Sequence, residues 1–262
     1  MFLMLMGPLL LIHFFYFLAV IKKNLSVIDT CWGLGFIVIS ILGCLESHFT
    51  NVRENLIALL TLIWGLRLAV FLHLRNHGKP EDFRYAAWRQ EWGEKTNIIA
   101  YFKVYWLQYI LMLVVALPLF GAHSEQHRPL NQINILGLII WILGFSWEVI
   151  ADQQKSIFKN RPENKNKFIN TGLWKFSRHP NYFGEAFLWW GVGLTAFNGH
   201  NLWVLIGPLF LNFLLLKVSG VPMLEKRYKG YAHYEQYALE TPTMIPSLKK
   251  IIVSMTKKRL IK

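Results

Sequence analysis

Cysteine is scarce in this sequence. Two cysteines, Cys31 and Cys44, occur among 262 residues, and both lie in one apolar run. Two thiols in one such run form neither a disulfide framework nor a Cys-x-x-Cys metal site. We expect both to be free thiols in the core.

Acidic residues are few, and no metal-ligand cluster is apparent. The chain has 15 Asp and Glu against 28 Lys and Arg, a formal net charge of +13. Such basicity can indicate nucleic-acid binding. Here the basic residues gather between apolar runs, so membrane topology explains them better, and no nucleic-acid partner is expected.

His73 and His77 lack a third ligand, and no metal site is expected.

A dinucleotide-binding fingerprint is also missing. The run Gly191–Ala196 matches G-x-G-x-x-A, but it lies inside an apolar run with no strand before it. We interpret these glycines as helix-packing residues.

Long hydrophobic runs dominate what is present. Hydrophobic residues make up 54% of the chain, with 11 Trp and 19 Phe, above the usual share of a soluble domain. The first run has no basic region before it and no small-residue cleavage site, so it is expected to be retained. We predict an all-α integral membrane bundle over residues 1–262. Seven spans are predicted, at about residues 2–21, 27–45, 56–74, 98–120, 132–151, 181–197 and 202–218.

The basic residues predict the orientation of this bundle. Nearly all Lys and Arg follow the first, third, fifth and seventh runs, whereas the other links hold only Arg53 and Arg128. Basic loops stay in the cytosol, so the N-terminus is predicted outside and the C-terminus inside. The basic loops are then expected to converge on one pocket for a soluble, anionic ligand.

The stretch Gly172–Gly193 leads from a basic loop into a Trp-rich apolar helix. Pro180 suits a first helical turn, and Tyr182 and Glu185 share one helix face. A helix N-terminus and the guanidinium of Arg178 both attract anions. One interpretation is a phosphate or carboxylate site in which Glu185 holds a hydroxyl or an amine. The other is a basic membrane-edge loop with an interfacial tyrosine and a paired glutamate.

Two further groups leave alternatives open. Glu148 and Asp152 are four residues apart, and they either bind ribose hydroxyls or an amide, or form a solvated helix end. Four tail tyrosines recur with a period near three, at Tyr228, Tyr231, Tyr234 and Tyr237. They form either a lid that stacks on a nucleotide or an interfacial helix.

Charged residues inside apolar runs are functional candidates by default. Asp29 lies near the start of the second run and Arg67 within the third. They either serve the chemistry or pair with each other.

Three separated motifs resemble one membrane family. They are Glu148–Lys155 (EVIADQQK), Gly172–Trp174 (GLW) and Ser177–Glu185 (SRHPNYFGE). Together they resemble the steroid 5α-reductase-like family, in particular its bacterial branch of unknown function, over nearly the whole chain.

This resemblance implies a membrane reductase in which NADPH binds on the cytosolic side. A hydride passes to the β-carbon of an enone in a steroid-like or other lipid-soluble substrate. Residues 132–246 are implied to form the cofactor-binding half, and a bacterial inner membrane is the implied location. The expected cofactor contacts are Lys79, Glu148, Asp152, Lys159, Trp174, Arg178, His179, Asn181, Glu185 and Tyr234.

The residues that would polarise the substrate carbonyl depart from the family pattern. In that family a Glu and a Tyr hydrogen-bond the enone carbonyl, and these two positions fall near Asp29 and at Trp64. A Trp donates a hydrogen bond but no readily transferred proton. Asp29 and Tyr182 are therefore the expected catalytic donors.

A second family is an alternative. The run Arg178–Tyr182 is similar to the Arg-His-Pro-x-Tyr motif of the isoprenylcysteine carboxyl methyltransferases, which use S-adenosylmethionine. A methyltransferase is therefore the alternative to the reductase, and a lipid-binding or structural protein is a third possibility.

Overall fold

The structure, a computed structural model, describes residues 1–124, 129–165, 167–226 and 228–259. Every regular element in these ranges is a helix, as the sequence predicts. Arg128, one of the residues used to predict the orientation, lies outside the described ranges.

The chain divides into two compact units. Unit 1 comprises Met1–Ile135 and Val192–Gly207, and unit 2 comprises Leu136–Gly191 and Pro208–Lys262. The boundaries fall inside three helices, α8, α9 and α10.

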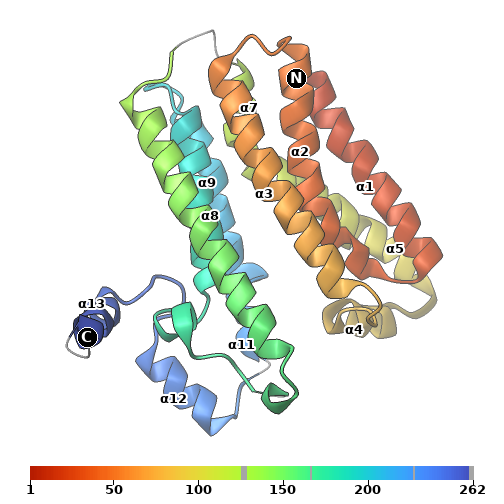
Figure 1. Cartoon of the computed structure of the whole chain (residues 1–262). Helices are drawn as coiled ribbons and strands as arrows, with labels where there is room; N and C mark the ends of the chain where they lie inside the picture. Colours follow the sequence, from red (N-terminus) through yellow and green to blue (C-terminus); the bar gives the residue numbers. More distant parts are fainter. Residues whose placement is uncertain (125–128, 166, 227, 260–262) are drawn as a thin grey trace. The chain divides into compact units, whose positions relative to one another are not determined.

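Unit 1 contains the first three long helices and the segments that follow them. The helices α1, α2 and α3 pack in sequence order (Figure 1). Its elements are α1 (Phe2–Lys22), η1 (Leu25–Val27), α2 (Ile28–Glu46), α3 (Val52–Asn76), α4 (Phe83–Trp92), η2 (Gly93–Lys95), α5 (Thr96–Ala100), the π-helical η3 (Tyr101–Trp106), α6 (Leu107–Val115), α7 (Leu117–Ser124) and η6 (Leu202–Leu205).

Unit 2 is built on two long helices followed by a helical tail. Its elements are α8 (Gln132–Lys159), η4 (Pro162–Asn164), η5 (Gly172–Lys175), α9 (Pro180–Ala196), α10 (Ile206–Phe213), the π-helical η7 (Leu214–Val218), α11 (Val221–Lys226), α12 (Ala232–Glu240) and α13 (Leu248–Arg259).

Three glycines allow helices to pack closely. In unit 1, a Cβ on Gly33 would lie 2.3 Å from the carbonyl oxygen of Gly65, so α2 and α3 touch through their backbones. In unit 2, a Cβ on Gly184 would lie 2.5 Å from the backbone nitrogen of Glu148, which sets α9 directly against α8. Gly191 approaches Trp141 in the same way, with a Cβ-to-nitrogen distance of 2.6 Å. The interpretation of Gly191 as a helix-packing residue is confirmed.

The predicted spans agree with the helices except at three places. The loop expected over residues 75–97 contains α4, because Asp82 caps that helix by accepting from the backbone N–H of Arg84 at 3.1 Å. The span expected at 98–120 is divided at Ala116, between α6 and α7. Pro118 follows two residues later, and its ring disfavours a continuous helix through this point. α8 continues two turns beyond the predicted end of its span, to Lys159.

Six helical segments of the described chain are long and apolar enough to cross a membrane. The chain is therefore treated as an integral membrane protein. α9 has 17 residues and is not among the six. The count of seven spans and the orientation stay predictions. Both cysteines are free and buried, as expected.

Candidate functional site

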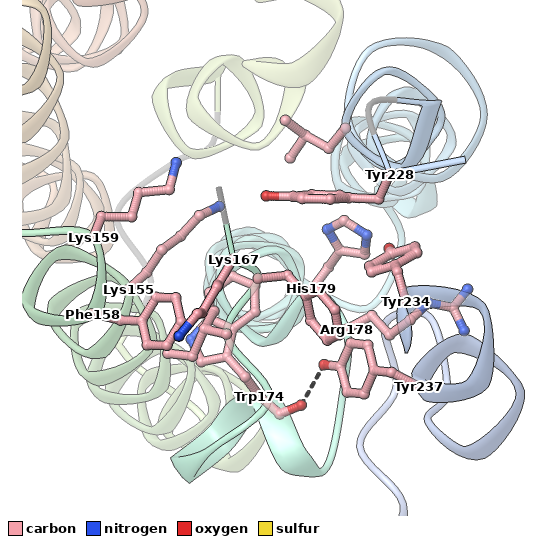
Figure 2. A pocket seen from close by; sticks show the side chains of 13 residues that line it. Lys155, Phe158, Lys159, Lys167, Trp174, Arg178, His179, Tyr228, Tyr234 and Tyr237 are labelled. Atoms are coloured by element: carbon pink, nitrogen blue, oxygen red, sulfur yellow. Dashed lines mark hydrogen bonds between the residues drawn. The ribbon is translucent and has the colours of Figure 1, made fainter. Parts of the chain in front are cut away.

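A pocket in unit 2 gathers aromatic rings and amines. Its empty space, part of which is open solvent, amounts to about 610 Å³. Figure 2 shows amines on one side of it and the tyrosines of the tail on another. Its lining residues include Lys155, Phe158, Lys159, Lys167, Phe168, Trp174, Arg178, His179, Tyr228, Tyr234 and Tyr237.

The rings of one wall contact one another. Phe168 stacks on Tyr237 at a centroid distance of 5.3 Å and meets Tyr234 edge-on at 5.2 Å, while Tyr228 stacks on Tyr234 at 4.8 Å. Burial raises the pKa of both Tyr234 and Tyr237 above the ordinary phenol value, so both phenols keep their protons. This wall therefore offers flat apolar faces together with hydroxyl groups.

Trp174 joins the pocket to α8. Its indole N–H donates to the carbonyl oxygen of Ala151 at 3.1 Å, and its ring lies 4.8 Å from the ammonium nitrogen of Lys155. The hydroxyl of Tyr237 donates to the carbonyl oxygen of Trp174. The indole of Trp174 is thus bound to α8 and its backbone to the tail, and the ring makes a cation–π contact with Lys155.

One ring nitrogen of His179, Nδ1, has no hydrogen-bond partner among the described residues. Its Nε2 lies 3.1 Å from Oε1 of Glu225, and its ring stacks on Tyr182 at 5.4 Å with an interplanar angle of 5°. Burial lowers the pKa of His179 below its ordinary value, against the hydrogen bond to Glu225, which raises it. A neutral ring that donates from Nε2 keeps a lone pair on Nδ1. That nitrogen is buried and has no hydrogen-bond partner among the described residues.

Arg178 holds the tail against the start of α9. Its Nε donates to Glu225 at 2.7 Å, its Nη1 to the carbonyl oxygens of Ala238 and Thr241 at 2.7 and 2.6 Å, and its Nη2 to Glu225 and Thr243 at 3.3 and 2.9 Å. A guanidinium has five N–H groups, and these five bonds use all of them. A phosphate contact by Arg178, as predicted from the sequence, requires at least one of these bonds to break.

Neighbouring backbone bonds support the same arrangement. The amide of Arg178 donates to the carbonyl oxygen of Pro242 at 2.9 Å, and the hydroxyl of Ser177 donates to that of Met244 at 2.8 Å. Ser177 and Arg178 are therefore tied to residues 241–244 of the tail.

The pocket brings together some of the predicted cofactor contacts. Lys159, Trp174, Arg178, His179 and Tyr234 all line it. The other predicted residues of unit 2 do not line it. They are Glu148, Asp152, Asn181, Tyr182 and Glu185.

Burial distinguishes these remaining residues of unit 2. Glu148 is 2% exposed and Asp152 is 6% exposed, so the alternative of a solvated helix end is wrong. The side-chain oxygen of Asn181 is buried without a partner among the described residues. The roles of all five residues in binding or catalysis stay predictions.

Lys79 and Asp29 belong to unit 1. Asp29 lies 3.6 Å from a guanidinium nitrogen of Arg75 and 3.5 Å from one of Arg84, and it accepts from the hydroxyl of Tyr85 at 3.0 Å. The carboxylate thus holds α2 to the polar segment after α3. Catalytic use of Asp29 and cofactor binding by Lys79 stay predictions.

Several lining residues were missed by sequence reasoning. Lys155 lies one turn before Lys159 on α8, and Phe158 lies three residues after Lys155, so helical spacing could have identified both. Lys167 and Phe168 lie in an irregular segment between helices, where no periodicity points to a pocket. Within the described ranges, no group of three or more His, Cys, Asp or Glu side chains is placed to hold a metal ion.

Comparison with known proteins gives three curated relatives. An uncharacterized protein of Schizosaccharomyces pombe is 24% identical over 65% of this chain and 57% of its own length. The probable O-methyltransferase ustE of Ustilaginoidea virens is 31% identical over 36% of this chain and 32% of its own. The protein-S-isoprenylcysteine O-methyltransferase of Saccharomyces cerevisiae is 34% identical over 30% and 31%.

The chain thus spans little more than half the length of the first of these relatives and about a third of the other two. No solved structure matches the chain. One family model, described as a protein of unknown function (DUF1295), matches residues 15–241, most of the chain. These 227 matched positions include every lining residue of the pocket, and the chain belongs to the DUF1295 family.

Proposed function

We propose that this protein is a membrane O-methyltransferase that uses S-adenosylmethionine and acts on a lipid-soluble substrate. Two of its relatives carry the name O-methyltransferase. The observation in the structure that supports the proposal is the combination, in one pocket, of stacked tyrosines with the bare Nδ1 of His179. The sequence-based expectation of a reductase takes second place.

The residues of the pocket fit this cofactor. A purine stacks on aromatic faces, such as those of Tyr234 and Tyr228. A carboxylate binds lysine ammonium groups, and Lys155, Lys159 and Lys167 line the pocket. A lone pair on buried Nδ1 of His179 accepts from an N–H or O–H group, and such a partner would remove the cost of leaving it unpaired.

The cofactor, when bound, supplies a methyl group on a positively charged sulfur atom, open to attack by a substrate oxygen. The chain's own residues then have three tasks. The tyrosine wall excludes water and orients the purine. Glu225 fixes the tautomer of His179, so that Nδ1 is the acceptor nitrogen. The bonds of Arg178 hold the tail over the site.

Isothermal titration of the purified full chain with S-adenosylmethionine tests the proposal. We expect saturable binding that Tyr234→Ala weakens by about 1–3 kcal/mol, the usual contribution of one stacked base. Tyr231→Ala is the matched control, because Tyr231 is 56% exposed and does not line the pocket. Binding that is absent, or equally weakened by both substitutions, contradicts the proposal.

One observation favours NADPH reduction as a second candidate. Three lysines line the pocket, and Glu225 is not among its lining residues. The carboxylate of Glu225 instead accepts from Arg178 and lies within hydrogen-bond distance of His179. A cationic lining attracts a cofactor with several phosphates. The resemblance adds roles for Glu148, Asp152, Asn181 and Glu185 in holding sugar and amide groups. Under this proposal, titration with NADPH in place of S-adenosylmethionine gives saturable binding that weakens steeply with added salt.

A further inference from the structure

The last described helix is amphipathic and too short to cross a membrane. α13 has 12 residues, about 18 Å of helix against a hydrocarbon core of about 30 Å. Leu248 is 74% exposed and Ile252 is 63% exposed, one helical turn apart on one face. Ile245, just before the helix, is also exposed, at 71%.

The opposite side of α13 faces the rest of unit 2. The ammonium of Lys250 donates to the hydroxyl of Thr241 at 3.1 Å, and the amide of Ser247 donates to the carbonyl oxygen of Phe176 at 2.9 Å. On a helical projection, Lys250 lies roughly 160–200° from Leu248 and Ile252. The apolar ridge of Leu248 and Ile252 therefore points away from the part of unit 2 that anchors the helix.

The charge of this segment indicates what covers the ridge. Residues 247–262 contain six Lys and Arg and no Asp or Glu. An apolar ridge flanked by basic residues is the pattern of a helix that lies in the interface of an anionic bilayer. A protein partner with an apolar groove would have no need of so uniform a charge, whereas anionic headgroups attract each added basic residue.

We propose that α13 is a lipid-binding element that places Leu248 and Ile252 in the headgroup region of a membrane rich in anionic phospholipid. The basic side chains bind the phosphate groups, and the apolar ridge enters the boundary with the acyl chains. This surface is separate from the pocket, so the proposal does not depend on which cofactor binds there.

The test uses the full chain in nanodiscs with a fluorophore on Ile252→Cys. The native Cys31 and Cys44 are buried, and the unsubstituted chain shows whether they react with the label. One set of nanodiscs contains phosphatidylcholine alone and the other also contains phosphatidylglycerol, each with and without spin-labelled lipid as a quencher. Ser254→Cys is the matched control, because it lies on the face opposite Ile252.

We expect spin-labelled lipid to quench the label at position 252 much more in the anionic nanodiscs, and the label at 254 to be little quenched in either. Lys249→Glu changes the charge by two units. It should lower the equilibrium between bound and free helix about 25-fold, at about 1 kcal/mol per charge.

Three results would each overturn the proposal. One is equal exposure to water at 252 and 254. Another is quenching at 252 that is independent of phosphatidylglycerol and of Lys249. The third is shielding of 252 from water without quenching by lipid, which means that protein covers the ridge.

Discussion

Arg178 and Glu225 form a two-point ion pair, with Nε–Oε1 at 2.7 Å and Nη2–Oε2 at 3.3 Å, across 47 residues of sequence. The same carboxylate lies 3.1 Å from Nε2 of His179. One glutamate of the tail thus fixes two consecutive residues at the start of α9. This contact is one of several that tie the tail to the residues before α9.

Removing the guanidinium should loosen the tail. Arg178→Ala removes the ionic partner of Glu225 and the donors to two backbone carbonyls, and we expect a loss of about 3–5 kcal/mol, as for buried pairs that lose one partner. Arg178→Lys keeps the charge but not the forked geometry, so it should recover only a small part. Thermal unfolding in mild detergent measures both.

The exposed Arg161 of the same unit provides the control. Arg161→Ala should change stability by less than about 0.5 kcal/mol. If Arg178→Ala is as mild as this control, the tail is held by other contacts.

Stability should fall in mildly acidic solution because of His179. Burial lowers the pKa of His179 below its ordinary value of about 6.5. Between its folded and unfolded pKa values the unfolded chain binds more protons, so stability rises with pH there and is lost as pH falls below about 6.5. Unfolding curves of the native chain and His179→Gln over pH 4.5–7.5 measure this slope, which should be smaller in the variant. Identical slopes would mean that His179 does not titrate differently in the two states.

Asp82 should stabilise α4 as its cap. It accepts from the backbone N–H of Arg84 at 3.1 Å and from its Nε at 2.8 Å. Asp82→Ala should cost about 0.5–2 kcal/mol, whereas Asp82→Asn keeps a capping oxygen and should cost less. Chemical denaturation compares the two, and equal losses would show that the cap contributes little.

Gly184 should tolerate no side chain. A Cβ there would lie 2.5 Å from the nitrogen and 2.8 Å from the Cα of Glu148, both backbone atoms that cannot turn aside. Gly184→Ala should therefore destabilise unit 2 by about 1–3 kcal/mol, and Gly184→Val by more. Thermal unfolding of the two variants should show this order, and an Ala variant as stable as the native chain would contradict the close packing of α8 and α9.

The membrane helices could be predicted from the sequence because long apolar runs need no tertiary information. Trp174 and His179 belong to a short run of unusual residues that the sequence marks, and they line one pocket with Tyr234 of the tail, whereas the binding of a cofactor by these three residues stays a prediction. The binding of Arg178 to the tail could not be predicted, because its partners lie 47 to 65 residues away and no periodicity relates them. Lys167 and Phe168 enter the pocket from an irregular segment, which local patterns do not describe.

Photochemical cross-linking of radiolabelled S-adenosylmethionine to the full chain tests directly whether this cofactor binds in the pocket of unit 2. The account predicts adducts in peptides from residues 155–179 or 224–237, which unlabelled S-adenosylmethionine abolishes and which Tyr234→Ala reduces but Tyr231→Ala does not. Adducts confined to other peptides, or a reaction that unlabelled cofactor does not compete away, would contradict it.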